Sequence, residues 1–458
     1  MELKEIHSVY FLGIGGIGMS ALARWFHAND FAVAGYDKTP TLLTSVLEKE
    51  GINIHFSDDV HAISEKFKDK KSTLIVYTPA VPVGHSELQF FQKEGFQVKK
   101  RAEVLGLLTR QYFTIAVAGT HGKTTTSSMV AHILHHSGLN TMAFVGGISQ
   151  NYGSNLILND KTGASPIVVV EADEFDRSFL QLSPNLAIVT TVDPDHLDIY
   201  DNQADFEQTF RDFIDKIPAD GSLVYNKKSC AINLEGVVAS QRSYGISEGE
   251  IQAKNIRAVD GEQVFDYVGE QEISDLQLAL PGLHNIQNAL SAISVCLEVG
   301  VSVEKIKKAV KAYQGVKRRF EYVIKSKEMV YVDDYAHHPS ELEALIESVH
   351  HLFPNKKITM VFQPHLFSRT NDFMDGFAEA LAKVDELYLL DIYPARELPM
   401  EGVTSKVLFD KIKMASKTLT TKADLMNDLK GIEPEIMVTA GAGDIDVFIQ
   451  PIKKMLLS

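Results

Sequence analysis

The residues best suited to chemistry form a glycine-rich loop in the first half of the chain. The loop lies between an apolar run (114–118) and a helix-like segment, and it consists of Gly119, Thr120, His121, Gly122, Lys123, Thr124 and Thr125. In such a loop, backbone N–H groups surround phosphates, the lysine reaches the terminal ones, and a threonine hydroxyl can bind Mg²⁺. The general pattern has an earlier glycine where this chain has Val117. The sequence therefore predicts a shorter variant of a phosphate-binding loop.

Acidic residues follow two later apolar runs, where strands are expected to end. Glu171, Asp173 and Glu174 come after one run, and the segment 193–198 (DPDHLD), which contains His196, ends the next. Carboxylates at the carboxyl edge of a sheet, beside a phosphate loop, are well placed to hold Mg²⁺. Alone, such acids are often plain turn residues, and a single histidine is often structural. Because they occur together after the phosphate loop, they predict a magnesium nucleotide site.

A second glycine pattern lies near the N-terminus. Residues 13–18 (GIGGIG) match G-x-G-x-x-G and stand between a predicted strand (8–12) and a predicted helix (17–28). Glycine lets the backbone turn tightly and approach a pyrophosphate, which the helix N-terminus then favours. Asp37 ends the next predicted strand, where an acid could hold a ribose hydroxyl. Alone, the pattern indicates NAD or another nucleotide diphosphate, or a tight turn without a ligand.

Later groups of polar residues could also bind ligands. Asn285 and Asn288 lie at the start of a predicted helix, where Asn285 is a plausible N-cap. The basic run 317–319 (KRR) could neutralise a phosphoryl group or be a solvated linker. The segments 333–339 (DDYAHHP) and 363–370 (QPHLFSRT) follow apolar runs. Both are expected at strand carboxyl ends, where open α/β sheets bind ligands, although paired histidines can also be plain surface residues.

Composition limits the class of protein. The chain has 458 residues and a formal net charge of −15, which argues against nucleic acid or an anionic membrane as the main partner. No stretch approaches the ~18 apolar residues of a membrane span, and the N-terminus does not resemble a signal peptide. Two distant cysteines, Cys230 and Cys296, indicate reduced thiols. We expect a cytoplasmic protein that is a monomer or a weak homodimer.

Short β-branched runs alternate with helical patterns from end to end, which is typical of α/β proteins. The pattern predicts three α/β domains, at residues 1–109, 110–315 and 316–458. Helices are also expected from Thr124 to His135 and over 285–299. Strands are predicted at 8–12, 31–36, 73–77, 114–120, 167–173, 186–193, 329–336, 358–363, 386–393 and 435–443.

In this order and spacing, the motifs resemble the Mur ligase family over the whole chain. The motifs are GIGGIGMS, GTHGKTTT, EADE, DHLD, HNIQNAL, RRFE, DDYAHHP and QPHLFSRT. The resemblance implies a Rossmann-like N-terminal domain that binds a UDP-sugar, a central P-loop ATPase-type sheet that binds ATP and Mg²⁺, and a Rossmann-like C-terminal domain that brings an amino acid. The implied reaction joins the lactyl carboxylate of UDP-N-acetylmuramate to L-alanine through an acyl phosphate, giving ADP and phosphate.

The resemblance also implies roles for individual residues. Thr124 and Glu171 would hold Mg²⁺, His196 would lie near a second ion, and Lys123 would contact the phosphates. Asn288 would contact adenine, Asp334 the ribose and Arg319 the γ-phosphate. The amine of the amino acid needs a base, for which His196 and His337 are candidates. The UDP-sugar would contact Gly15, Gly16, Ile17, Gly18 and Asp37, and the amino-acid pocket would contain Tyr335, His337, His365 and Arg369.

Three alternatives remain open at this stage. A sister ligase that adds an intact tripeptide to the same sugar nucleotide shares most motifs, although GIGGIGMS and QPHLFSRT favour the alanine reaction. Some family members have an arginine at the position of Leu366, so amino-acid selectivity carries over less securely. An NAD-dependent oxidoreductase would explain the first glycine loop but not the second. A nucleotide switch without enzymatic activity would need no amino-acid pocket.

Overall fold

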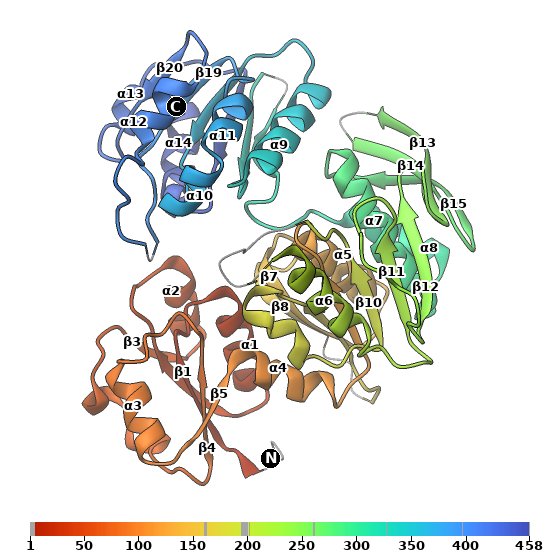
Figure 1. Cartoon of the computed structure of the whole chain (residues 1–458), viewed down its shortest axis with the longest axis vertical. Coiled ribbons are helices and arrows are strands. Elements are labelled where there is room, and N and C mark those ends of the chain that lie inside the picture. Colours follow the sequence, from red (N-terminus) through yellow and green to blue (C-terminus); the bar gives the residue numbers. More distant parts are fainter. Residues whose placement is uncertain are drawn as a thin grey trace. The chain divides into compact units, whose positions relative to one another are not determined.

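The computed structural model describes residues 5–159, 163–193, 200, 202–259, 262–326, 328–395 and 397–457. Figure 1 shows three α/β regions along the chain, each built on one sheet. The backbone forms two compact units. The first holds the first two sheets and ends at Tyr313, and the second holds the third sheet from Gln314 onward, together with two short earlier segments. Three α/β domains are therefore confirmed, while the boundaries near residues 110 and 316 stay predictions.

The N-terminal sheet has five parallel strands in the order β3-β2-β1-β4-β5. Helices α1 (Ile17–Ala28) and α4 (Arg101–Thr109) pack on one face, and α3 (Ser86–Lys93) packs on the other. A further helix, α2 (Leu42–Lys49), connects β2 to β3. The strands are β1 (Ser8–Leu12), β2 (Ala32–Tyr36), β3 (Asn53–His55), β4 (Thr73–Tyr77) and β5 (Gln97–Lys100).

The middle sheet has ten strands in the order β15-β14-β13-β12-β11-β10-β6-β9-β7-β8. Strand β6 lies in its interior and runs parallel to both neighbours, so the loop that follows β6 opens at the centre of the sheet. The strands are β6 (Thr114–Ala118), β7 (Thr141–Ser149), β8 (Ser154–Leu158), β9 (Ile167–Glu171), β10 (Leu186–Val189), β11 (Ser222–Asn226), β12 (Ser240–Gly245), β13 (Ile251–Val259), β14 (Glu262–Val268) and β15 (Glu272–Leu278). The helices are α5 (Lys123–His136), α6 (Gln203–Ile214), α7 (Leu283–Glu298) and α8 (Val303–Ala312).

The C-terminal sheet has six strands in the order β16-β17-β21-β18-β19-β20, and only β16 is antiparallel to its neighbour. Helices α9, α11 and α12 pack on one face, and α13 and α14 on the other. The strands are β16 (Glu321–Lys325), β17 (Val330–Asp334), β18 (Ile358–Phe362), β19 (Glu386–Leu389), β20 (Lys417–Leu419) and β21 (Ile436–Ala440). The helices are α9 (Pro339–Leu352), α10 (Phe367–Asp372), α11 (Met374–Leu381), α12 (Ser405–Lys411), α13 (Leu425–Asp428) and α14 (Ile449–Leu456).

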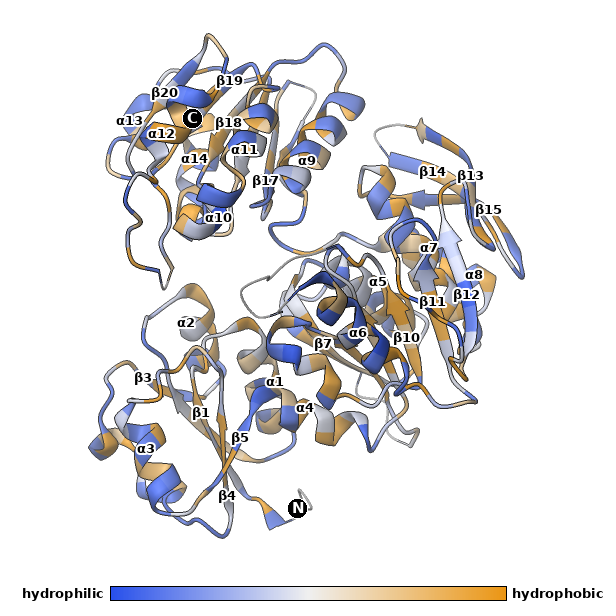
Figure 2. Cartoon of the chain, in the orientation of Figure 1, coloured by the Kyte–Doolittle hydropathy of each residue, from blue (hydrophilic) through white to orange (hydrophobic). Residues whose placement is uncertain are grey.

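Burial on both faces explains the composition of the central strands. Every residue of β1, β6, β10, β18 and β21 is buried, and β1 and β10 appear orange in Figure 2. Parallel strands that are covered by helices on both faces need continuous apolar runs rather than alternating ones. These runs were the signal that located the strands in the sequence.

Helix α1 belongs to the packing of both sheets in the first unit. The Arg24 guanidinium pairs with Glu50 (Nε–Oε2 2.8 Å) and donates to the side-chain oxygen of Asn155 on β8. The Asn155 amide in turn donates to the Ile17 carbonyl (2.5 Å) and to Ser20 Oγ (2.9 Å). Trp25, the only tryptophan of the chain, is 7% exposed and belongs to the same continuous apolar core. This junction fixes the start of α1 relative to the middle sheet.

Most predicted elements are confirmed, and the differences have local causes. The bounds of β1, α1 and β4 agree with the prediction, whereas β10 ends at Val189 instead of residue 193. Thr190 and Thr191 leave the strand because they bond to the phosphate loop. The N-cap prediction for Asn285 is wrong, because α7 begins at Leu283 and Asn285 lies inside its first turn. Strands β3, β5, β7, β8, β11 to β16 and β20 were not predicted.

Two expectations from composition concern membranes and thiols. None of the helices in the described part of the chain combines the length and apolar character that a membrane crossing requires. Cys230 and Cys296 are free thiols, as expected.

A buried histidine links α5 to its neighbours in the first unit. His132 is 2% exposed, and its Nε2 lies 3.0 Å from the Ala309 carbonyl oxygen, while Nδ1 lies 3.0 Å from the Tyr152 hydroxyl. A carbonyl oxygen only accepts, so Nε2 carries the proton and the Tyr152 hydroxyl donates to Nδ1. Burial, with a smaller effect from His136, lowers the pKa of His132 from 6.5 to about 4.

This shift predicts an acid-sensitive stability. Between about pH 6.5 and 4 the unfolded chain binds a proton that folded His132 refuses, so stability present above this range is lost as the pH falls, by up to roughly 3 kcal/mol. Thermal unfolding at about pH 7.5 and about pH 5 measures the effect. The midpoint of the wild type should fall further than that of His132→Gln. The exposed His350 supplies the control His350→Gln, which should behave like the wild type. Equal pH sensitivity in all three proteins would contradict the prediction.

Candidate functional site

The phosphate loop lies where the sequence predicted it, between β6 and α5, and it is held in shape by the end of β10. Gly119 has φ +127°, and a Cβ there would lie 2.8 Å from the Thr191 amide, so only glycine fits. The His121 amide donates to Thr191 Oγ1 (3.0 Å), and the Thr120 hydroxyl donates to the Asp193 carbonyl (2.9 Å). The loop is thus preformed by contacts to a neighbouring strand.

Lys123 is the first residue of α5 and its ammonium group is enclosed. It lies 2.7 and 2.8 Å from the two carboxylate oxygens of Glu174 and donates to the carbonyl of Gly119 (2.6 Å). The Lys123 side chain is 13% exposed and that of Glu174 only 1%. Burial alone would lower the pKa of Lys123, but the carboxylates of Glu174, Asp173 and Glu171 raise it above its ordinary value. The lysine therefore keeps its charge at neutral pH and offers it to an anion.

The predicted metal ligands Thr124 and Glu171 are neighbours. Thr124 Oγ1 donates to Glu171 Oε1 (3.1 Å), and the Gly146 amide on β7 donates to Glu171 Oε2 (3.1 Å). A side chain at Gly146 would overlap this carboxylate. A hydroxyl and a carboxylate oxygen are hard donors of the kind that Mg²⁺ prefers, so the two side chains fit that ion. The third predicted ligand, His196, lies outside the described residues.

Thr125 and Asn288 complete the surroundings of the loop. The Thr125 side chain is buried, and its carbonyl accepts from the Tyr313 hydroxyl (3.3 Å). Gly122 has φ +83°, and a Cβ there would lie 2.7 Å from the side-chain oxygen of Asn288. Asn288 is therefore directly beside the loop, while its contact with adenine stays a prediction.

The first glycine loop also has the predicted form. Gly13 has φ +85°, Gly16 precedes the first residue of α1, and the Gly15 amide donates to Asp37 Oδ2 (2.7 Å). Asp37 Oδ1 accepts from the Thr39 amide (3.2 Å). Asp37 thus holds the loop itself, and its predicted contact with a ribose stays a prediction.

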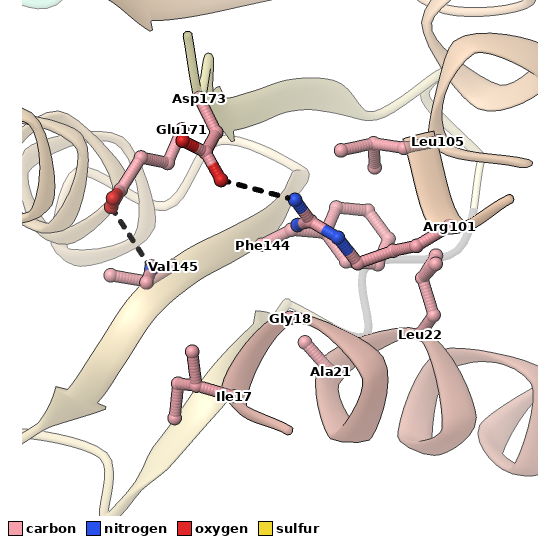
Figure 3. A pocket seen from close by; sticks show the side chains of 11 residues that line it. Ile17, Gly18, Ala21, Leu22, Arg101, Leu105, Phe144, Val145, Glu171 and Asp173 are labelled. Atoms are coloured by element: carbon pink, nitrogen blue, oxygen red, sulfur yellow. Dashed lines mark hydrogen bonds and ion pairs between the residues drawn. The ribbon is translucent and has the colours of Figure 1, made fainter. Parts of the chain in front are cut away.

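The end of the first glycine loop and the acids at the end of β9 border one cavity of about 140 Å³ in the first unit. Figure 3 shows Ile17 and Gly18 of α1 on one side and Glu171 and Asp173 on the other. The remaining lining residues are Ala21, Leu22, Arg101, Leu105, Phe144, Val145 and Gly146. A cavity of this size holds a fragment of a nucleotide sugar rather than the whole molecule.

Arg101, which the sequence did not single out, extends across this cavity. Its Nη2 lies 3.4 Å from Asp173 Oδ2, and its side chain is 24% exposed. The two residues are far apart in the chain, and no motif contains Arg101, so only the fold reveals the pair. The sequence also did not reveal that Glu174 pairs with Lys123, although Glu174 belongs to the EADE motif. It did not reveal that Gly146 contacts Glu171 either.

The predicted amino-acid residues converge in the second unit. His337 Nδ1 lies 2.9 Å from the Tyr335 carbonyl oxygen, and the His337 ring is 6.0 Å from the ring of His365. Arg369 Nη1 lies 3.5 Å from His365 Nδ1. The ring of Tyr393, which was not predicted, stacks on His365 at 5.8 Å. These side chains come from the carboxyl ends of β17, β18 and β19, which explains why separate motifs meet.

Leu366 has an unusual backbone within this cluster. Its φ is +70°, and its amide donates to the Tyr393 carbonyl (2.9 Å). Such a conformation costs a non-glycine residue about 1–3 kcal/mol and tends to occur at functional sites. The following turn is anchored because the Ser368 amide donates to Glu397 (3.0 Å).

The basic run before β16 is tied to the same region. The guanidinium carbons of Arg318 and Arg319 lie 5.1 and 5.2 Å from the centre of the Tyr335 ring. Asp334 accepts from the amides of Phe320 and Ala336, both at 2.7 Å, and burial raises its pKa to about 6. The carboxylate thus orders the chain around it, and its contact with a ribose, like that of Arg319 with a phosphate, stays a prediction.

Three segments of the chain, each containing one of the three sheets, match models of known protein families. Residues 8–113 match the model described as Mur ligase family, catalytic domain, and residues 117–296 match the Mur ligase middle domain. Residues 318–445 match the model described as Mur ligase, glutamate ligase domain. Together these matches span most of the chain.

Individual proteins are similar over the full length. UDP-N-acetylmuramate–L-alanine ligase of Flavobacterium johnsoniae is 50% identical, with 100% of this chain and 99% of that protein covered. The crystal structure of UDP-N-acetylmuramate-alanine ligase from Thermotoga maritima is 27% identical, covers 98% of both chains and has a TM-score of 0.82. A murein peptide ligase from Psychrobacter arcticus, at 23% identity and a TM-score of 0.73 with 98% of both chains covered, shares the fold.

The enclosed ion pair predicts strong coupling between Lys123 and Glu174. Lys123→Met leaves a buried carboxylate without its partner, and Glu174→Gln leaves a buried ammonium, so each should lower the free energy of unfolding by about 3 kcal/mol. The double variant removes both charges and should cost much less than the sum. Urea unfolding of the four proteins measures this coupling, and additive losses would show that the pair is not a unit.

Proposed function

Because the chain belongs to the Mur ligase family, we propose that its two glycine loops and the cavity lined by Gly18 and Glu171 carry out the family's ligation chemistry. The protein is an ATP-dependent ligase of peptidoglycan synthesis that joins L-alanine to UDP-N-acetylmuramate. The observation that supports the proposed roles of these residues is the shared cavity. The helix start expected to bind a diphosphate and the acids expected beside the γ-phosphate line the same space.

The chemistry requires that a carboxylate be activated. Hydroxide is a poor leaving group, so the lactyl carboxylate takes a phosphoryl group from ATP, and the amine of L-alanine displaces phosphate from the acyl phosphate. Both reacting groups begin as anions. Two unit charges about 4 Å apart repel by about 4 kcal/mol at an effective dielectric near 20. Positive groups at this point are therefore the main catalytic requirement.

Lys123 meets part of this requirement. It is charged, lies at the start of α5 and is held beside Glu174 by hydrogen bonds that a phosphate oxygen can replace. Thr124 and Glu171 would hold Mg²⁺, which neutralises phosphate charge when it is bound. The loop amides and the N-terminus of α5 would complete the phosphate site. The predicted contribution of His196 to metal binding belongs to this proposal.

The second unit would bring the amino acid. Arg369 offers a guanidinium to the carboxylate of L-alanine, and Tyr335 and His365 line its surroundings. Burial lowers the pKa of His337, so its imidazole is neutral at physiological pH. Its Nδ1 faces only acceptors, the Tyr335 carbonyl and the Glu341 carboxylate, so Nε2 holds the lone pair. This favours His337 over His196 as the base that takes a proton from the ammonium group.

A cytoplasmic location and a monomeric or weakly dimeric state remain part of the proposal. The location agrees with the need for ATP and a nucleotide sugar as substrates.

The function is tested by phosphate release from ATP. With UDP-N-acetylmuramate present, release should depend on L-alanine and should not be supported by the tripeptide in its place. Lys123→Ala should abolish turnover while leaving UDP-N-acetylmuramate binding nearly intact, since the sugar nucleotide is expected on the other glycine loop. Turnover like that of the wild type in this variant, or release without any sugar nucleotide, would refute the assignment.

Arg369 provides a test of the amino-acid pocket. Loss of a charged hydrogen bond costs about 1.5–3 kcal/mol, so Arg369→Ala should raise the KM for L-alanine by roughly 10- to 150-fold. The KM values for ATP and UDP-N-acetylmuramate should stay nearly constant. Lys383→Ala, which removes an exposed charge paired with Glu343, is the control and should keep all three values. A uniform loss of kcat with unchanged KM for L-alanine would contradict the assigned role.

A further inference from the structure

Among the described residues that line the shared cavity, Arg101 is the only lysine or arginine. It is the first residue of α4, and Figure 3 shows its side chain lying across the space between α1 and the end of β9. The Arg101 side chain fits in this space because residue 18 is a glycine. A Cβ at Gly18 would lie 3.1 Å from Arg101 Cδ and would overlap the guanidinium nitrogen Nη1. The missing side chain at Gly18 thus leaves room for Arg101, in addition to the part that this glycine has in the first glycine loop.

The present partner of Arg101 is replaceable. The contact with Asp173 is a single N–O distance of 3.4 Å, and the Asp173 side chain is 40% exposed. Half-exposed ion pairs of this kind contribute at most about 1 kcal/mol. Glu171, the other acid of the cavity, is already engaged by Thr124 and Gly146. The guanidinium can therefore exchange Asp173 for a ligand anion at little cost.

The position of Arg101 indicates which ligand anion could replace Asp173. The diphosphate of the sugar nucleotide is expected at the start of α1, and the γ-phosphate of ATP beside Lys123 and Glu171. The carboxylate that is phosphorylated must lie between them, and the cavity occupies this place. A planar guanidinium binds a carboxylate through two parallel hydrogen bonds, which fixes its orientation as well as its charge.

We propose that Arg101 recognises the lactyl carboxylate of UDP-N-acetylmuramate and holds it for phosphorylation; this rests on the proposed function. Arg101 then distinguishes this substrate from nucleotide sugars that lack the lactyl group. Its positive charge also reduces the repulsion between the carboxylate and the γ-phosphate. Compensation of this repulsion is the main catalytic requirement of the reaction.

The test compares two ligands that differ in this carboxylate. Binding of UDP-N-acetylmuramate and of UDP-N-acetylglucosamine, which has a hydroxyl in place of the lactyl ether, is measured by titration calorimetry. Arg101→Ala should weaken UDP-N-acetylmuramate by about 10- to 100-fold, as expected for a charged hydrogen bond, and should leave UDP-N-acetylglucosamine unchanged. Equal losses for both ligands would mean that Arg101 binds the diphosphate, and would overturn the proposal, as would no loss at all.

Three further variants separate recognition from structure. Arg110→Ala removes an exposed arginine at the other end of α4 and should bind both ligands like the wild type. Asp173→Asn breaks the same ion pair but keeps the guanidinium, so it should retain or tighten UDP-N-acetylmuramate binding; a loss equal to that of Arg101→Ala would show a purely structural role. Arg101→Lys should recover part of the preference, because the charge remains without the paired hydrogen bonds.

The experiments distinguish a failure of this proposal from a failure of the proposed function. If the wild type releases phosphate with UDP-N-acetylmuramate and L-alanine while Arg101→Ala retains its ligand preference, only the role of Arg101 fails. If the wild type shows no such turnover, the proposed function fails first.

Discussion

The site depends on an ammonium group that is almost removed from water. A buried cation is stable only when anions compensate it, and Lys123 has Glu174 at hydrogen-bond distance together with the nearby acids at the end of β9. The ammonium group donates to both carboxylate oxygens of Glu174 and to the carbonyls of Gly119 and Thr120, so an anion that binds Lys123 has to compete with these acceptors. The pair therefore keeps the loop in its binding shape before any nucleotide arrives. It also means that binding exchanges one anion for another rather than enclosing a new charge, which keeps the desolvation cost small.

The second constraint is the shared use of α1. Its start carries the first glycine loop, while its body packs against the middle sheet through Arg24 and Asn155. These buried polar contacts fix α1 in direction as well as in position, because each donor there has a defined acceptor. The start of α1 and Glu171, which lies beside the phosphate loop, consequently border one cavity, although more than a hundred residues separate them. In the second unit, the carboxyl ends of neighbouring parallel strands bring Tyr335, His337, His365 and Arg369 together in a comparable way.

Much of this arrangement could be predicted because the signals are local. A glycine loop between an apolar strand and a helix is specified by adjacent residues, and both loops lie where the sequence placed them. The partners of these loops could not be predicted in the same way. Arg101 meets Asp173, and Gly146 meets Glu171, only after β7 and β9 have paired and α4 has docked. Asp37 and Asp334 were recognised as important, but their hydrogen bonds to backbone amides depend on turns that composition does not specify. Where Thr190 and Thr191 leave β10, contacts with the loop outweigh their preference for a strand.

The single tryptophan has a practical consequence. Trp25 is buried in α1, within the core that joins the first two sheets and one turn away from Ala21 and Leu22 of the cavity. Fluorescence that is excited at wavelengths absorbed by tryptophan but not by tyrosine therefore originates from one known place. Light emission at this residue reports how water and neighbouring groups reach the junction, without any label or engineered probe. A titration of the unmodified protein followed by tryptophan emission would thus report on the surroundings of α1.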